Sequence, residues 1–155
     1  MFSTYKRNYP KVIECNGRIT IPAYQRGYVW SEHEWEDFYN DILNIIKLDY
    51  KPHFMGTILL KTNSGIFEIV DGQQRLITLT LFLFAFRDVY HSLKFNYIEN
   101  ILKNRIIVND KDNVYESIFR KVYNRGQRTI NNYKKKNIET AYQFFKKKFE
   151  NKNLF

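Results

Sequence analysis

The feature that most constrains the fold is a short strand that passes through a polar turn into a long apolar segment. Residues 68–84 read EIVDGQQRLITLTLFLF, and the apolar run Leu76–Phe86 is bracketed by Arg75 and Arg87. A bilayer-spanning helix needs about 20 apolar residues, so this run is too short to cross a membrane. It predicts instead a helix from about Leu76 to Leu93, buried in the core and entered directly from a strand.

Size and composition predict one folded domain. The chain has 155 residues with 44% hydrophobic and 17% aromatic content, which is far from a disordered composition. Its single cysteine, Cys15, allows no internal disulfide and suits a reducing compartment. The N-terminal MFSTYKRNYP has no apolar stretch after its basic residues, so we expect no signal peptide. We therefore expect a soluble protein of the cytoplasm that does not associate with membranes.

The positive charge is concentrated near the C-terminus. Of the net charge of +9, residues 121–155 supply almost all, with ten lysines and arginines against two acidic residues. A basic segment of this kind can follow a nucleic-acid backbone. A solvated helix face rich in lysine explains the same charge, so both interpretations stay open.

Turn and periodicity signals predict an α+β fold. A strand over Arg18–Ile21 ends at Pro22. The S-E-H-E sequence from Ser31 to Glu34 is a capping box that opens a helix. The apolar residues of this helix recur at helical spacing: Trp35, Phe38, Ile42, Ile45 and Ile46.

The rest of the chain predicts one hairpin and further helices. FMGTILL and IFEIV are two strands joined through TNSG, and Asn16–Gly17 is a turn signal. Three helical stretches follow the buried one: Tyr97–Lys103, Asp110–Tyr123 and ETAYQFFKKKFE, with a polar loop at Asn124–Thr129. The expected architecture is a small sheet with packed helices and a helical C-terminal half.

The DGQQR turn is a candidate anion site. A strand that enters a helix through a glycine leaves unpaired N–H groups at the positive helix end, and these attract phosphate. Arg75 at a helix start is unfavourable for the helix dipole, so its presence indicates another purpose, such as clamping phosphate oxygens. Asp71 could cap the helix or hold Mg²⁺, and Gln73 and Gln74 could orient a water or read a base edge. The alternative is that Asp71 is an ordinary N-cap in a polar surface turn.

A second polar cluster follows the first strand. Tyr24, Gln25 and Arg26 alternate directly after that strand, with Tyr28 and Trp30 just beyond. Aromatic rings beside glutamine and arginine are typical of pockets that stack nucleobases. Tyr28 and Trp30 fit equally well as core residues that lead into the next helix.

Several blocks in order resemble a known family. IPAYQRGYVW, a W-x-x-F helix with DI, HFMGTILL and EIVDGQQRLITL together resemble the N-terminal domain of GmrSD-type restriction endonucleases, which is similar in fold to the ParB/sulfiredoxin superfamily. The resemblance covers about residues 12–90, and more loosely the DNVYESIF and AYQFF segments.

This resemblance implies a role in bacterial anti-phage defence. Family members discriminate modified phage DNA, for example glucosylated or phosphorothioated DNA, and couple this to nucleotide hydrolysis. The implied nucleotide-phosphate site is carried by Asp71, Gly72, Gln73, Gln74 and Arg75. The block Tyr24, Gln25 and Arg26 is implied to lie near that site or a DNA-sensing pocket. Gly56 is expected to permit a close backbone approach nearby.

The chain also departs from the family pattern. Family proteins usually continue into a C-terminal HNH-type nuclease domain, but His33, His53 and His91 form no nuclease-like cluster. We expect either an excised or truncated domain that lacks this nuclease domain, or a short stand-alone member that needs a partner subunit. Residues 1–95 would form a ParB-like nucleotide- and DNA-sensing core, and residues 96–155 a helical extension of the same domain.

The leading hypothesis is a domain that binds and hydrolyses a nucleoside triphosphate with Mg²⁺. Arg75 and the N–H groups after Gly72 would hold phosphates, and Arg26 would add positive charge on the reacting group. Asp71 would coordinate the Mg²⁺. A standard P-loop enzyme is excluded, because the sequence contains no G-x-x-x-x-G-K-[ST]. The alternatives are a DNA-binding module that senses modification without NTPase activity, and an interaction domain whose DGQQR turn only caps a helix.

Overall fold

A small mixed sheet forms one side of the molecule. The computed structural model describes residues 18–22, 24–47, 54–63, 66–90, 106–108 and 133–151. The four strands lie in the order β2-β3-β1-β4, with β1 parallel to both of its neighbours and β2 antiparallel to β3. The strands are β1 (Arg18–Ile21), β2 (Leu59–Asn63), β3 (Ile66–Asp71) and β4 (Ile106–Val108).

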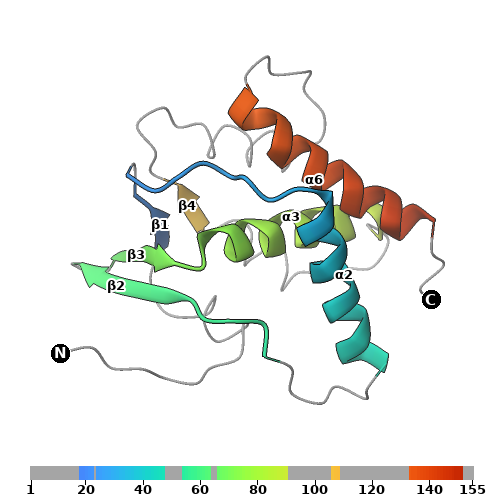
Figure 1. The fold of residues 1–155 in the computed structure, drawn as a ribbon, viewed down its shortest axis with the longest axis horizontal. Coiled ribbons are helices and arrows are strands. Elements are labelled where there is room, and N and C mark those ends of the chain that lie inside the picture. The colour runs from blue at the N-terminus through green and yellow to red at the C-terminus, as the bar shows by residue number, and fades with distance from the viewer. Residues whose placement is uncertain are drawn as a thin grey trace.

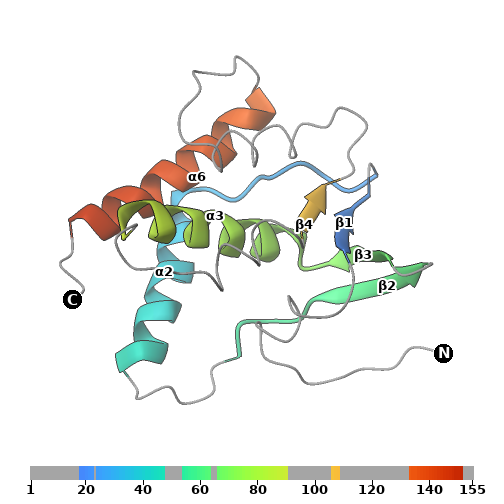
Figure 2. The same ribbon diagram turned by 180° about the vertical axis from the view of Figure 1, so that it is seen from behind.

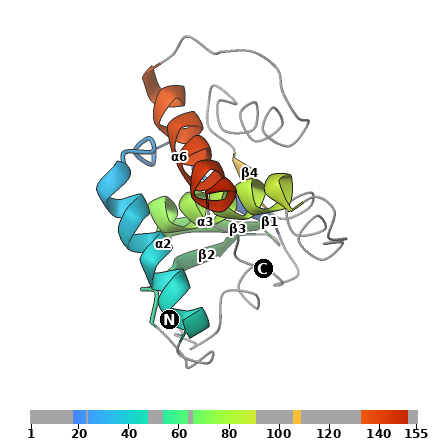
Figure 3. The same ribbon diagram turned by 90° about the vertical axis from the view of Figure 1, so that its right-hand side faces the viewer.

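In the described ranges, three helices pack beside and upon this sheet. They are α2 (Glu32–Lys47), α3 (Gln73–Val89) and α6 (Tyr133–Glu150). Helix α3 leaves the sheet and runs beneath α6, and α2 crosses it in both views (Figures 1 and 2). Seen from the side, α3 lies against one face of the sheet with α6 above it (Figure 3). Within the described ranges, no helix is long and apolar enough to span a membrane.

Helix α3 forms the centre of the core. Its side chains are buried around most of its circumference, as expected for a helix that is apolar on all sides. Towards the sheet, Leu76 and Ile77 share the core with Ile19 and Ile69, and all four are fully buried. Because β1 and β3 each contribute such residues, the sheet and the first half of α3 form one continuous packed unit.

An aromatic cluster joins the second half of α3 to the other helices. The Phe82 ring of α3 meets Phe145 of α6 edge-on at 5.6 Å and Phe149 at 5.1 Å. From α2, Phe38 reaches the same Phe82 ring at 5.9 Å. At the rim, the Lys148 ammonium of α6 lies 2.6 Å from the Glu36 carboxylate of α2. The three helices therefore share one core.

The structure confirms the α+β class and several predicted elements. Strand β1 has the predicted bounds. Helix α2 begins after a capping box, in which the Ser31 N–H and hydroxyl donate to the Glu34 carboxylate at 2.8 and 2.7 Å. These hydrogen bonds lower the pKa of Glu34. The predicted hairpin is also present, as β2 and β3.

The structure corrects the secondary-structure prediction in four places. FMGTI is not strand: β2 begins only at Leu59, and Gly56 has a φ of 94°, which no regular strand adopts. Helix α3 begins at Gln73 rather than Leu76 and ends at Val89. Helix α6 begins at Tyr133, ahead of the predicted ETAYQFFKKKFE, because its polar first turns hide the start. Strand β4 lies within the part predicted to be helical.

Other predictions lie outside the described residues. These are the Asn16–Gly17 turn, the helices over Tyr97–Lys103 and Asp110–Tyr123, and the loop at Asn124–Thr129. The likeness to the ParB/sulfiredoxin fold and the boundary between residues 1–95 and 96–155 remain predictions.

Candidate functional site

The DGQQR sequence forms the junction between β3 and α3. Asp71 is the last residue of β3, Gly72 is the N-cap with φ 86° and ψ 10°, and Gln73 begins the helix. A Cβ at Gly72 would lie 2.8 Å from the Thr57 carbonyl oxygen. Glycine is therefore required here by its left-handed backbone and by the neighbouring chain.

The start of α3 lacks the usual capping side chain. Among the described residues, no side chain caps it, and its first turn contains no acidic residue. The interpretation of Asp71 as an ordinary N-cap is therefore wrong, because the sharp turn at Gly72 places Asp71 in the strand. The N–H groups of the first turn and the helix dipole leave this end positive, which favours an anion.

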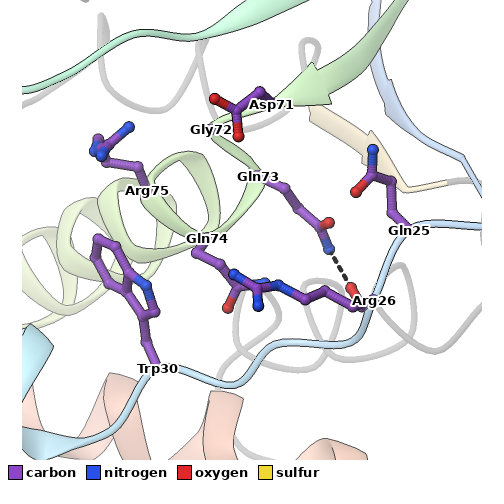
Figure 4. Close-up of a pocket in the computed structure, with 8 residues that line it drawn as sticks. All are labelled: Gln25, Arg26, Trp30, Asp71, Gly72, Gln73, Gln74 and Arg75. Carbon is purple, nitrogen blue, oxygen red and sulfur yellow. Dashed lines mark hydrogen bonds between the residues drawn. The ribbon is translucent and has the colours of Figure 1, made fainter.

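The two glutamines of the motif bind the backbone of a neighbouring segment. Residues 25–30 run alongside the first half of α3, and Gln73 Nε2 donates to the Arg26 carbonyl at 2.8 Å (Figure 4). Gln74 makes two bonds: its Nε2 donates to the Gly27 carbonyl at 3.0 Å, and its Oε1 accepts from the Val29 N–H at 2.8 Å. The side-chain amides thus hold this segment against the helix start.

Further hydrogen bonds hold the segment at Gln25 and at Tyr28. Gln25 Nε2 donates to the Val70 carbonyl of β3 at 3.0 Å. The Tyr28 hydroxyl lies 2.7 Å from Thr78 Oγ1 of α3 and accepts a bond from Trp35 Nε1 of α2 at 2.8 Å. Tyr28 is only 3% exposed, so the core interpretation of this residue is confirmed.

One polar atom of the site has no partner. Gln73 is 5% exposed, and its Oε1 is buried without a hydrogen bond to any residue that the structure describes. Because Nε2 donates to the Arg26 carbonyl, the amide orientation is fixed and Oε1 remains an acceptor. An unpaired buried acceptor costs about 1–3 kcal/mol, and such groups in native structures often have a catalytic role or bind a water.

Arg75 is seated on the segment that precedes β2. Its Nη1 donates to the Thr57 carbonyl at 3.1 Å. The guanidinium also lies over Gly56, where an added Cβ would come within 2.5 Å of Arg75 Cζ. The expected close approach at Gly56 is therefore present, and its partner is the arginine of the motif.

These groups surround a small polar pocket of about 170 Å³. Figure 4 shows the Arg26 side chain running back past Gln74 towards Trp30. The pocket is lined by Gln25, Arg26, Trp30, Asp71, Gly72, Gln73, Gln74 and Arg75. The structure thus brings the DGQQR residues together with Gln25 and Arg26.

Two of the predicted site residues, Tyr24 and Gly56, do not line the pocket, whereas Trp30 does. Tyr24 is 73% exposed and does not line the pocket, and Gly56 acts beneath Arg75. Trp30 lines the pocket, although its sequence fits a core residue equally well. The sequence does not predict the contact of Arg75 with the Thr57 carbonyl, because every residue type provides a backbone oxygen.

The described pocket residues provide too few side-chain ligands to hold a metal ion in the absence of a bound phosphate. Within the described part of the chain, no group of three His, Cys, Asp or Glu residues could hold a metal. Asp71 is the carboxylate of the pocket lining. Mg²⁺ is commonly held by one or two carboxylates together with substrate phosphates, so Asp71 fits Mg²⁺ that arrives with a phosphate chain.

Comparison with known families decides where the chain belongs. The model of the family described as "GmrSD restriction endonuclease, N-terminal domain" matches residues 5–155. The chain belongs to this family. A comparison of this GmrSD N-terminal domain, residues 1–155, with curated proteins finds no match. Membership gives the domain a function related to restriction and defence.

Proposed function

We propose that this GmrSD N-terminal domain binds the phosphates of a nucleoside triphosphate at the start of α3 and hydrolyses the nucleotide. The observation that carries the proposal is the helix start led by Gly72, which lacks a side-chain cap and lies in one pocket with Arg26 and Arg75. Positive groups that converge on a helix N-terminus are the arrangement that phosphate oxygens require.

Positioning and charge would supply most of the catalysis. Phosphoryl transfer depends mainly on electrostatic stabilisation, so no covalent nucleophile is needed. The N–H groups after Gly72 and the Arg75 guanidinium would hold phosphate oxygens, and Arg26 would approach from the facing segment. Asp71 would hold Mg²⁺ beside the phosphates, where the ion would neutralise developing charge.

The unpaired Gln73 oxygen supports a role for this glutamine in placing the attacking water. An amide oxygen accepts a hydrogen bond from water and orients it, as glutamines do in other nucleotide hydrolases. The Gln74 oxygen already accepts from the Val29 N–H. Gln73 is therefore the stronger candidate of the two.

The pocket volume limits which part of the nucleotide it encloses. About 170 Å³ is smaller than the roughly 300–1,000 Å³ of pockets that enclose small-molecule ligands. The phosphate chain would occupy the pocket, while sugar and base extend along its rim. Trp30, which lines the pocket, offers an aromatic surface there for stacking.

Nucleotide binding tests the proposal directly. Calorimetry with ATP, GTP, CTP and UTP in the presence of Mg²⁺ should show binding of at least one nucleotide by the wild type. Arg75→Ala should weaken that binding at least tenfold and abolish turnover, because hydrogen bonds to charged groups are worth about 1.5–3 kcal/mol.

The control is Lys61→Ala, which removes an exposed positive charge from β2, outside the pocket lining. It should leave binding unchanged. A folded wild type that binds no nucleotide would contradict the proposal and favour DNA sensing without NTPase activity. Unchanged turnover in Arg75→Ala would remove Arg75 from the site.

A further inference from the structure

The Gln74 side chain imitates a backbone pairing. It is 7% exposed, and its amide donates to the Gly27 carbonyl and accepts from the Val29 N–H. These two groups flank Tyr28, so a single side chain fixes the backbone on both sides of that residue. Gln74 lines the pocket, but its amide oxygen and nitrogen both bond to backbone and its side chain is buried, so a contact with a ligand would compete with these bonds.

The segment has a separate anchor in the core. Tyr28 is buried and lies 2.7 Å from Thr78 Oγ1, and Thr78 in turn donates to the Gln74 carbonyl at 2.8 Å. This anchor fixes the side chain of Tyr28. It does not fix the orientation of the two peptide groups on either side of Tyr28. The Gln74 bonds act on that orientation, because they engage the peptide groups themselves.

Both residues beyond these peptides face the pocket. Arg26 precedes Gly27 and Trp30 follows Val29, and both line the pocket opposite the start of α3. Arg26 is otherwise exposed on a segment without regular secondary structure. Its long side chain loses rotamer entropy on binding, and a backbone that already directs the side chain into the pocket avoids the additional cost of ordering the segment.

We propose that Gln74 is a positioning residue, which acts on bound phosphate through Arg26 rather than by contact. This inference rests on the proposed function, since it assumes that phosphates bind between Arg26 and Arg75. It gives the two adjacent glutamines different tasks: Gln73 retains a free acceptor in the site, and Gln74 orients the facing wall.

A double-mutant cycle on nucleotide binding tests the proposal. Gln74→Met keeps the side-chain length and removes both amide bonds, and Arg26→Ala removes the group that Gln74 positions. Gln74→Met should weaken binding about tenfold in the wild type, within the range of coupling within one network, and less than twofold in the Arg26→Ala background. In the Arg75→Ala background it should keep its tenfold effect.

Thr78→Val is the matched control. It lies one turn further along α3 and removes the bond to Tyr28, on the core side of the segment. It should lower the thermal midpoint while its effect on binding does not depend on Arg26. If Gln74→Met does not fold by circular dichroism, Gln74→Asn takes its place in the cycle, since the shorter amide cannot keep both bonds, to the Gly27 carbonyl and from the Val29 N–H.

The outcomes separate this inference from the function beneath it. Effects of Gln74→Met and Arg26→Ala that simply add would overturn the positioning role while nucleotide binding stands. Equal dependence on Arg26 and Arg75 would also overturn it, because that pattern indicates general loss of the site. A wild type that binds no nucleotide would overturn the proposed function itself.

Discussion

On the scale of single residues, two glycines shape the candidate site because they have no side chain. Gly72 turns the chain into α3, and Gly56 leaves space in which the Arg75 guanidinium lies. Both have positive φ, a conformation that L-residues other than glycine adopt at a cost. The two positions meet at the Thr57 carbonyl, which accepts from Arg75 and lies against Gly72.

This geometry predicts that Gly56→Ala resembles Arg75→Ala in nucleotide binding. The new methyl group would displace the guanidinium, whose Cζ lies 2.5 Å from the ideal Cβ position. The strained φ should also lower the free energy of unfolding by about 1–3 kcal/mol. Calorimetry and urea unfolding measure the two effects.

The neighbouring Thr57→Ala is the control for this prediction. The Thr57 side chain is exposed, and the residue contributes its carbonyl oxygen, which the substitution keeps. Binding should therefore remain at the wild-type level. If Gly56→Ala binds nucleotide as tightly as Thr57→Ala, the position of Arg75 on Gly56 has no role in binding.

At the element scale, α6 belongs to the core that supports the site. It packs along α3 and α2, and its Phe145 is fully buried between Phe38 and Phe82. Tyr142 of the same helix donates to the Asp88 carboxylate of α3 at 2.7 Å, and burial with this hydrogen bond raises the pKa of Tyr142. The second half of the helix that carries the site is thus held by α6.

We therefore predict that Phe145→Ala lowers the free energy of unfolding by about 3–5 kcal/mol, the usual cost of removing a buried phenylalanine side chain. Gln143→Ala, on the exposed face of α6, should change it by less than about 0.5 kcal/mol. Urea unfolding followed by circular dichroism measures both. Equal, small effects would show that α6 does not stabilise the core.

On the scale of the whole molecule, the described part of the basic C-terminal region contains lysines in two different environments. Lys148 reaches Glu36 of α2 and lies over the Tyr39 and Phe144 rings, so it contributes to helix packing. Lys147 is exposed. Among the described residues of this segment, an exposed lysine such as Lys147 is therefore the better candidate for DNA contact than Lys148.

If the domain binds DNA through this region, Lys147→Gln should reduce the salt dependence of binding. Each neutralised phosphate contributes about −0.9 to the slope of log affinity against log salt concentration. One lost contact therefore makes the slope less negative by about one. Fluorescence anisotropy with duplex DNA across a salt series measures it. Lys148→Gln, the control, should lower stability and keep the slope. Identical slopes in wild type and Lys147→Gln would exclude Lys147 as a phosphate contact.

Local signals in the sequence predict several elements of the structure and a candidate anion site. The strand at Arg18–Ile21, the capping box at Ser31 and the buried α3 follow from alternation, capping chemistry and apolar length. DGQQR indicated a helix start with an arginine that the helix dipole does not favour. These signals are readable because each depends on neighbours close along the chain.

The tertiary structure decided what each residue of the site contacts. Gln74 bonds across 45 and 47 positions of sequence to Val29 and Gly27, and Arg75 bonds across 18 to Thr57. Their partners are backbone groups, which every residue type provides, so no pattern of side chains announces them. For the same reason, Asp71 could be taken for a cap until the left-handed turn at Gly72 placed it in β3. Sequence specifies a site's chemistry locally, whereas its geometry depends on long-range contacts that only folding brings together.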